Sequence, residues 1–270
     1  MTLQTPVTIP QPSFSIAPCE RMLFVGSCFA DRIGQRAQEE KFRAVVNPDG
    51  VMYNPASILH TVSRTEVEPK VAFFTLGTNH VYILKETGEI VDNCRKMPQR
   101  LFEERELTIE ECVGYLSEAV QILLQRSPEV RVVVTVSPIR YAKYGFHGSA
   151  LSKAVLLLAA DALCKKYPDV VSYFPAYEIV LDELRDYRFY NPDMLHPSDQ
   201  AVEYIWERFS DTYFSPETHR FIQQWRPIKE ALAHRPFHPD SPEYQSFLAH
   251  TKEQARLLSL QYPGLELAFS

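Results

Sequence analysis

The pattern of apolar and polar positions predicts strands that alternate with helices along most of the chain. Short apolar runs at residues 22–25, 71–76 and 131–136 are typical of buried strands. Further strands are expected at 42–46 and 170–174, a hairpin at 80–84 and 89–92 on the edge of the sheet, and helices at 29–37, 54–62, 108–126, 152–166 and 198–209. This alternation predicts a doubly wound, mostly parallel α/β sheet, which binds ligands at the carboxyl ends of its strands.

The pattern changes in the last part of the chain. Ser215-Pro216 and Ser241-Pro242 each place a serine cap before a proline, as at the start of a helix, and no strand pattern follows. We therefore divide the chain into an N-terminal extension (1–20), an α/β domain (21–213) and a C-terminal helical extension (214–270). These last helices could pack on the domain, cover its site or form a dimer, and the sequence leaves the three options open.

Composition and charge exclude several classes of protein. Hydrophobic residues make up 45% of the chain and charged residues 23%, which is typical of a globular domain rather than a disordered one. The formal charge of −6, without a basic run, argues against nucleic acid or an anionic membrane as a partner. The N-terminus resembles no signal peptide, and no segment approaches a membrane span. The five cysteines are an odd number and form no C-x-x-C or Cys/His metal spacing, which favours a reducing compartment. We expect a cytoplasmic protein without a metal or cofactor.

The turn after the first predicted strand is the first candidate for chemistry. Gly26 ends the strand and Ser27 precedes a helix, so we expect the Ser27 hydroxyl to be exposed at the carboxyl edge of the sheet. The alternative is that Ser27 only caps the helix. The thiol of Cys28 could itself attack a substrate, but a cysteine at this place more often packs in the core, and Ser27 is the preferred nucleophile.

A serine nucleophile needs a base, and a loop bounded by Pro192 and Pro197 supplies one. Asp193 and His196 are three residues apart in this loop, so the carboxylate can reach the imidazole Nδ1 and leave Nε2 free for the serine. The alternative is that both are ordinary loop residues before a helix.

Taken together, these segments resemble a known family. Residues 26–30 spell G-S-C-F-A, by which the chain is identified as a member of the GSCFA family, itself similar to the SGNH/GDSL esterase superfamily. Residues 182–190 and 93–98 are also similar to the family. The resemblance implies a flavodoxin-like three-layer fold and hydrolase activity, with Ser27 as nucleophile and residues 193–196 as the closing D-x-x-H block.

The resemblance also implies an oxyanion hole, which is the set of donors that holds the negative oxygen of the tetrahedral intermediate. Its expected donors are the Ser27 N–H, the Gly50 N–H and the side chain of Asn79, within Gly77-Thr78-Asn79-His80. His80 stands where the superfamily usually has Asp.

Several further residues are candidates without an assigned role. Asn54 and Asn93 are alternative oxyanion donors or structural turn residues, and Arg140 is placed to hold an anionic or polar substrate group or a surface salt bridge. Asn54, Arg140, His80 and Tyr53 are the possible substrate-binding residues.

The sequence thus predicts a serine esterase that acts on a small acyl ester, with an O-acetylated carbohydrate as one substrate class. An O-acyltransferase with the same triad is the alternative, since both reactions need the same residues. The alternative from another class is a non-catalytic ligand-binding module, which the altered third block with His80 supports. A homo-oligomer is a further option for either.

Overall fold

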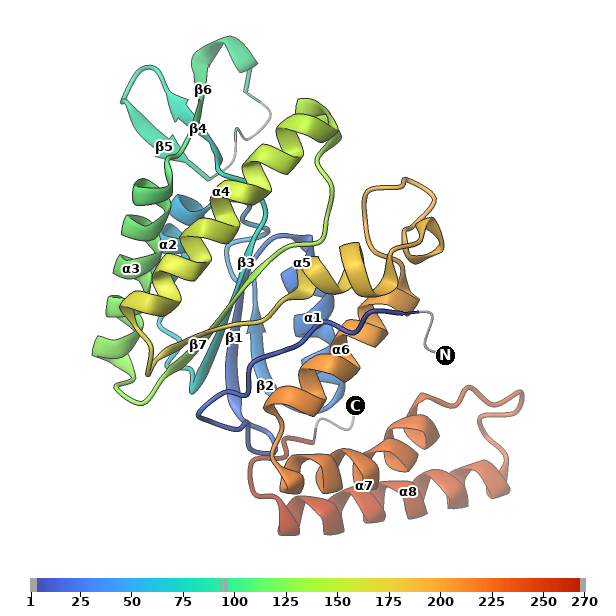
Figure 1. The fold of residues 1–270 in the computed structure, drawn as a ribbon. Helices are drawn as coiled ribbons and strands as arrows, with labels where there is room; N and C mark the ends of the chain where they lie inside the picture. Colours follow the sequence, from blue (N-terminus) through green and yellow to red (C-terminus); the bar gives the residue numbers. More distant parts are fainter. Residues whose placement is uncertain (1–3, 93, 95–96, 268–270) are drawn as a thin grey trace.

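Five short strands form one parallel sheet at the centre of the molecule (Figure 1). The computed structural model describes residues 4–92, 94 and 97–267. The strand order is β2-β1-β3-β7-β8, with every pair parallel. The strands are β1 (Arg21–Gly26), β2 (Arg43–Val46), β3 (Val71–Leu76), β7 (Arg131–Val136) and β8 (Val171–Tyr173). Because the apolar runs of β3 and β7 are buried on both faces, they lie in the middle of the sheet.

Helices cover both faces of the sheet because side chains alternate along each strand. Met22 and Phe24 of β1 pack with one group of helices, whereas Leu23 and Val25 pack with the other. The first group is α1 (Cys28–Glu39), α5 (Ala176–Glu178) and α6 (Asp199–Tyr213); the second is α2 (Pro55–Arg64), α3 (Ile109–Arg126) and α4 (Gly145–Lys166). The predicted doubly wound α/β fold is confirmed.

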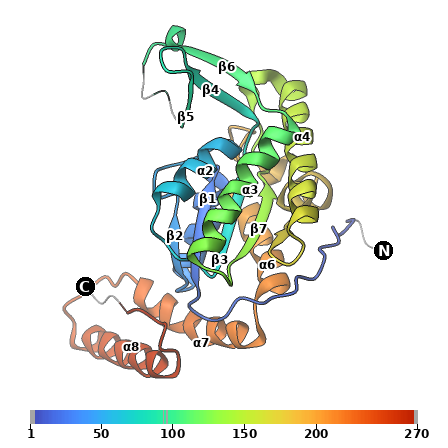
Figure 2. The same ribbon diagram turned by 90° about the vertical axis from the view of Figure 1, so that its left-hand side faces the viewer.

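The predicted hairpin forms, but its place in the fold was wrong. Its strands, β4 (His80–Leu84) and β5 (Glu89–Val91), join β6 (Phe102–Glu106) in a separate antiparallel sheet that stands away from the main one (Figure 2). The sequence analysis missed β6 because its residues after Phe102 are Glu, Glu, Arg and Glu, which lie at the surface of an edge strand and carry no alternating apolar signal.

Helix α4 begins at Gly145, seven residues before the predicted start at 152. No side chain caps it, and Gly145 has a φ of +68°, so the usual starting signals are absent. The segment Ala142–Lys166 is long and apolar enough to cross a membrane by length and composition. In the structure, however, α4 packs Leu156 and Leu163 into the core against the sheet.

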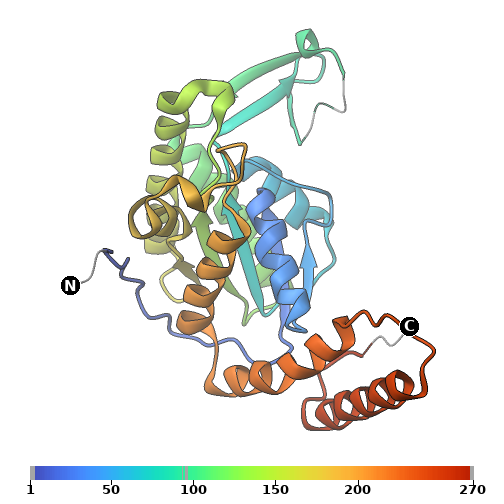
Figure 3. The same cartoon turned by 90° about the vertical axis from the view of Figure 1, so that its right-hand side faces the viewer.

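The last two helices pack at the end of the sheet opposite the carboxyl ends of the strands (Figures 1 and 3). They are α7 (Pro216–Ala233) and α8 (Pro242–Gln261), and Ser215 and Ser241 cap them as predicted. The indole N–H of Trp225 donates to the carbonyl of Glu39, the last residue of α1, at 2.9 Å. Of the three options left open by the sequence, the structure shows packing on the domain, away from the carboxyl edge of the sheet.

Short helical turns complete the chain. They are η1 (Gln99–Leu101), η2 (Ala142–Tyr144), the π-helix η3 (Ile179–Leu184) and η4 (Tyr187–Phe189). The last two precede the loop that carries Asp193 and His196.

Candidate active site at the carboxyl edge of the sheet

The turn after β1 depends on the glycine that ends the strand. Gly26 has a φ of +142°, and a Cβ at this position would lie 2.2 Å from the carbonyl oxygen of Thr75 on β3. Its N–H donates to the side-chain oxygen of Asn47 at 2.8 Å. Only glycine fits so close to the neighbouring strand, and this fit fixes where the next two side chains point.

Ser27 is fully buried between β1 and β3. Its backbone N–H donates to the Thr75 hydroxyl at 2.8 Å and to the Thr75 carbonyl at 3.1 Å, and its own Oγ lies 3.1 Å from the same hydroxyl. Oγ also accepts the N–H of Phe29 at 3.3 Å, so Ser27 is the cap of α1. The prediction of an exposed Ser27 hydroxyl was wrong, because the extended backbone continues through Ser27 and turns its side chain toward β3.

Cys28 occupies the position that had been expected for Ser27. It is the first residue of α1 and is half-buried, and its Sγ lies 3.8 Å from the hydroxyl oxygen of Tyr53. Its backbone N–H has no acceptor within the helix, and the amino end of a helix favours negative charge.

Asp193 and His196 form the expected pair. His196 Nδ1 lies 2.6 Å from Asp193 Oδ2, while Asp193 Oδ1 accepts the N–H groups of Leu195 and His196 at 2.9 and 3.0 Å. The backbone N–H groups of His196 and Leu195, with the imidazole, lower the pKa of Asp193 to about 2. The carboxylate is therefore ionised at neutral pH and fixes the imidazole through Nδ1, which leaves Nε2 unengaged by Asp193.

One cavity of about 280 Å³ is lined by both Cys28 and His196. It is lined by Cys28, Phe29, Asp31, Arg32, Gln35, Ile139, Asn191, His196, Pro197 and Val202. Ser27 is not among these residues. The structure therefore places His196 in one cavity with Cys28 rather than with Ser27.

The two other expected oxyanion donors, Gly50 and Asn79, each donate a hydrogen bond to a backbone carbonyl. The N–H of Gly50 donates to the carbonyl of Asn47 at 2.8 Å within an exposed turn. The side-chain amide of Asn79 is buried and donates to the carbonyl of Leu107 at 2.8 Å. The Gly50 N–H is therefore engaged within its turn, and the Asn79 amide, which has a second N–H, is buried.

Arg140 holds the loop that carries the Asp–His pair. Its backbone N–H donates to Leu195 and its guanidinium to Met194, each at 3.0 Å to a carbonyl oxygen. The guanidinium also lies 4.0 Å from the ring centre of Phe146. This arrangement supports a positioning role, which the sequence analysis had not weighed for Arg140.

The remaining candidates lie in other places. Asn54 caps α2 by accepting the N–H of Ser57 at 2.9 Å, so it has the structural role. His80 is buried in the small sheet and stacks on Tyr144 at 3.7 Å, and burial lowers its pKa. Tyr53, a possible substrate-binding residue, lies beside Cys28. Asn93 lies outside the described residues.

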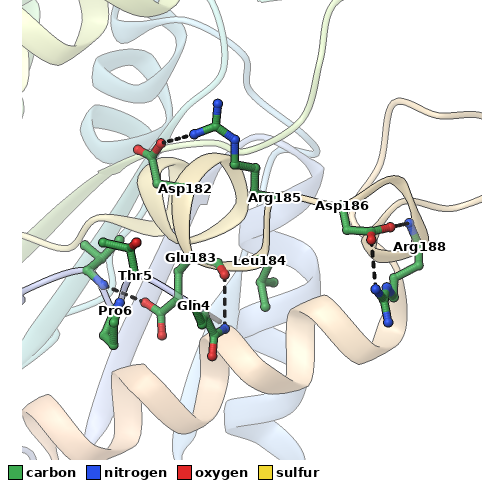
Figure 4. A pocket seen from close by; sticks show the side chains of 10 residues that line it. Gln4, Thr5, Pro6, Asp182, Glu183, Leu184, Arg185, Asp186 and Arg188 are labelled. Carbon is green, nitrogen blue, oxygen red and sulfur yellow. Dashed lines mark hydrogen bonds and ion pairs between the residues drawn. The ribbon is translucent and has the colours of Figure 1, made fainter. Parts of the chain in front are cut away.

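A larger cavity, of about 640 Å³, lies between the N-terminal segment and η3 and contains part of the 182–190 stretch (Figure 4). Its polar groups pair largely with one another. Glu183 accepts the N–H of Val7 at 2.9 Å, and Asp182 lies 3.7 Å from Arg185. These contacts indicate that this stretch anchors the N-terminal segment.

Metal chemistry has no candidate in the part of the chain that the structure describes. No group of three or more His, Cys, Asp or Glu side chains there could hold a metal ion.

Comparisons with known proteins place the chain in a family. No curated protein matches it. Similar solved structures include a GDSL-like lipase from Bacteroides thetaiotaomicron (11% identity, 71% of this chain and 86% of that one, TM-score 0.46). An acetylxylan esterase, Axe2, from Geobacillus stearothermophilus is 14% identical over 75% of this chain and 98% of that one, with a TM-score of 0.46. A carbohydrate esterase of family 3 from Talaromyces cellulolyticus is 10% identical over 75% and 98%, with a TM-score of 0.41.

The sequence profile described as "GSCFA family" matches residues 21–71 and 63–209, and the one described as "GSCFA domain protein, C-terminal domain" matches residues 225–269. These matches cover well over half of the chain, which therefore belongs to the GSCFA family.

Proposed function

We propose that this protein is a cysteine-dependent acyl-ester hydrolase, in which Cys28 is the nucleophile, His196 the general base and Asp193 the residue that orients the base. The observation that carries the proposal is the shared cavity of Cys28 and His196, from which the buried Ser27 is absent. The proposed reaction is the ester hydrolysis expected from the sequence, but the nucleophile is Cys28 rather than Ser27.

In the acylation step, the Cys28 thiol gives its proton to His196 Nε2 and the sulfur attacks the ester carbonyl carbon. The Asp193 carboxylate stabilises the resulting imidazolium through Nδ1, 2.6 Å away. The tetrahedral intermediate then breaks its bond to the alcohol oxygen, which takes the proton back from His196. The alcohol leaves, and the acyl group stays on Cys28 as a thioester.

In the deacylation step, His196 removes a proton from water, whose oxygen attacks the thioester carbonyl. The carbon–sulfur bond breaks, the carboxylic acid leaves, and the proton returns to the sulfur. An alcohol in place of water would give acyl transfer with the same residues, so the O-acyltransferase remains the alternative within this mechanism.

The size of the cavity supports a small acyl group. Its volume of about 280 Å³ lies at the lower end of the range for small-molecule sites. Acetyl esters, including O-acetylated carbohydrates, are the substrates that we propose to test first.

The test is turnover of p-nitrophenyl acetate by wild type and by C28A, S27A and H196A. We expect C28A to lose activity because it lacks the attacking sulfur. S27A should keep kcat within a few-fold, since its hydroxyl faces Thr75. The matched control is C164A, which removes another partly buried thiol, on α4.

Acid quenching during turnover, followed by peptide mapping, identifies the acylated residue. Acetyl on Cys28 that neutral hydroxylamine removes is the expected result, since this reagent cleaves thioesters. Acetyl on Ser27 would overturn the assignment and restore the serine. Absence of both acylation and turnover would instead favour a ligand-binding module.

A further inference from the structure

The proposed reaction lacks a second donor for its tetrahedral intermediate. The Cys28 N–H at the start of α1 is one donor, but the Gly50 N–H and the Asn79 amide are held by the carbonyls of Asn47 and Leu107. Two or more donors are usual for an oxyanion, because the charge on the oxygen must be held in a site with little water. A group directly beside Cys28 is therefore a candidate for the second hydrogen bond.

Tyr53 lies beside Cys28, although it is not among the residues that line the cavity shared with His196. Its hydroxyl oxygen lies 3.8 Å from Cys28 Sγ. In the tetrahedral intermediate, the oxyanion is bonded to the carbon that is itself bonded to Sγ. A hydroxyl 3.8 Å from Sγ is within hydrogen-bonding reach of an oxygen at that place. The ring is 39% exposed, so a substrate can approach it.

The position of Tyr53 is fixed from both sides, as an oxyanion donor requires. Its backbone carbonyl accepts the N–H groups of Gly77 and Thr78, at 2.9 and 2.8 Å, where the chain leaves β3. Its ring meets that of Tyr141 edge-on, with the ring centres 6.0 Å apart and the planes at 87°. A Cβ on Gly77 would lie 2.8 Å from that carbonyl and 3.0 Å from the Tyr141 hydroxyl, so the three residues pack tightly.

The hydroxyl keeps its proton at physiological pH. Burial, and then the neighbouring Cys28, raise the pKa of Tyr53 to about 12. A neutral phenol can donate a hydrogen bond to a negative oxygen, whereas a phenolate would repel it.

We propose that the Tyr53 hydroxyl is the second donor of the oxyanion hole, together with the Cys28 N–H. It takes the role that the sequence had suggested for Asn79 and Gly50. This inference rests on the proposed function, because it concerns the intermediate that forms on Cys28.

The test compares Y53F with wild type in two reactions of the same thiol. Hydrolysis of p-nitrophenyl acetate forms an oxyanion, whereas alkylation of Cys28 by iodoacetamide does not. We expect Y53F to lower kcat by about 10²–10³-fold, as loss of an oxyanion donor does, with little change in KM. The rate of Cys28 alkylation, followed by peptide mapping, should stay within a few-fold of wild type.

The matched control is Y82F, which removes a tyrosine hydroxyl from the small sheet, where it contacts Lys143. It should leave both rates unchanged. Y53F with full kcat, or with alkylation reduced in parallel with kcat, would overturn the donor role. A wild type whose turnover does not depend on Cys28 would overturn the proposed function itself, so the two failures are distinguishable.

Discussion

Two histidine–aspartate pairs among the described residues have similar hydrogen bonds and different surroundings. His196 Nδ1 lies 2.6 Å from Asp193 at the carboxyl edge of the main sheet. His60 Nδ1, on α2, lies 2.8 Å from Asp92, which follows β5 of the small sheet. Geometry of the pair alone would suggest two catalytic bases.

The partners of the two carboxylates differ. Asp193 is held by backbone N–H groups and the imidazole. Asp92 is shared between His60 and the guanidinium of Arg64, 2.6 Å away, and Arg64 also contacts Asp49 at 2.6 Å. Burial alone would raise the pKa of Asp92, but the hydrogen bonds from His60 and Arg64 outweigh it and leave the pKa lowered.

The cavities beside the two pairs also differ, in volume and in the residues that line them. The one beside His60 has about 590 Å³, twice the volume of the one beside His196. Among the described residues that line it, Asp49, Met52, His60, Arg64, Leu84, Ile90, Val91, Asp92 and Met97, none is Ser, Thr or Cys. This difference favours His196 rather than His60 as the general base of the proposed reaction.

The largest expected effect is a difference in kcat between variants of the two histidines. H196Q should lower kcat for p-nitrophenyl acetate by about 10²–10⁴-fold, since it removes the general base. H60Q should leave kcat within a few-fold, because glutamine can still donate a hydrogen bond to Asp92 and no nucleophile is nearby. A large loss in H60Q with little in H196Q would move the active site to the small sheet.

The second prediction is that replacing Asp193 lowers mainly activity, whereas replacing Asp92 lowers mainly stability. D193N should lower kcat by about 10²-fold or more, as the imidazole loses its orienting charge, with little change in unfolding free energy, because Asp193 lies on an exposed loop. D92N should lower the free energy of unfolding by about 1 kcal/mol, since it weakens a partly buried contact in which the Arg64 side chain is half exposed, and should leave kcat in place. Kinetics and urea unfolding of both variants measure the two quantities.

The fold could be predicted from the sequence where periodicity is strong. The runs of β3 and β7, and the serine-capped starts of α7 and α8, appear where the patterns placed them. The misses lie where local signals are weak. Strand β6 is charged and exposed, and α4 starts at an uncapped Gly145. Neither could be found from hydrophobic patterning.

The candidate site was predictable as a region but not to the residue. The strand–turn–helix after β1 and the Asp193–His196 contact follow from turn chemistry and spacing. Whether Ser27 or Cys28 faces the cavity depends on the residue at which the extended backbone ends and the helix begins. A shift of one residue matters because successive side chains on a helix point in directions roughly 100° apart. The contact between Ser27 and Thr75 decides this, and it joins residues 48 positions apart in sequence.

The third prediction concerns the arginines near the two pairs. Arg140 bonds the carbonyls of Leu195 and Met194, so R140M should loosen the loop of His196 and lower kcat by about tenfold with a smaller change in KM. R140K, which keeps a donor, should recover part of the loss. R64M should leave kcat unchanged and lower the melting temperature. Equal effects of R140M and R64M on kcat would argue against a positioning role.

The smallest expected effect is the pH dependence of the two aspartates' contributions to stability. The folded state lowers the pKa of each, so each contribution is fully present above the unfolded value of about 3.9 and is lost as the pH falls through the lower folded value. For Asp92, the difference in unfolding free energy between wild type and D92N should therefore shrink between pH 7 and pH 3.

For Asp193, the corresponding difference between wild type and D193N should change in the same direction but be smaller at pH 7, because the carboxylate is exposed to water. Urea unfolding at the two pH values, repeated at high salt, separates the cases, since added salt weakens a partly buried contact less than an exposed one. If the difference in unfolding free energy between wild type and D92N vanished at high salt, the contacts of Asp92 would be screened by solvent in the same way as those of Asp193. The two pairs would then differ only in the nucleophile beside them, and Cys28 alone would mark the active site.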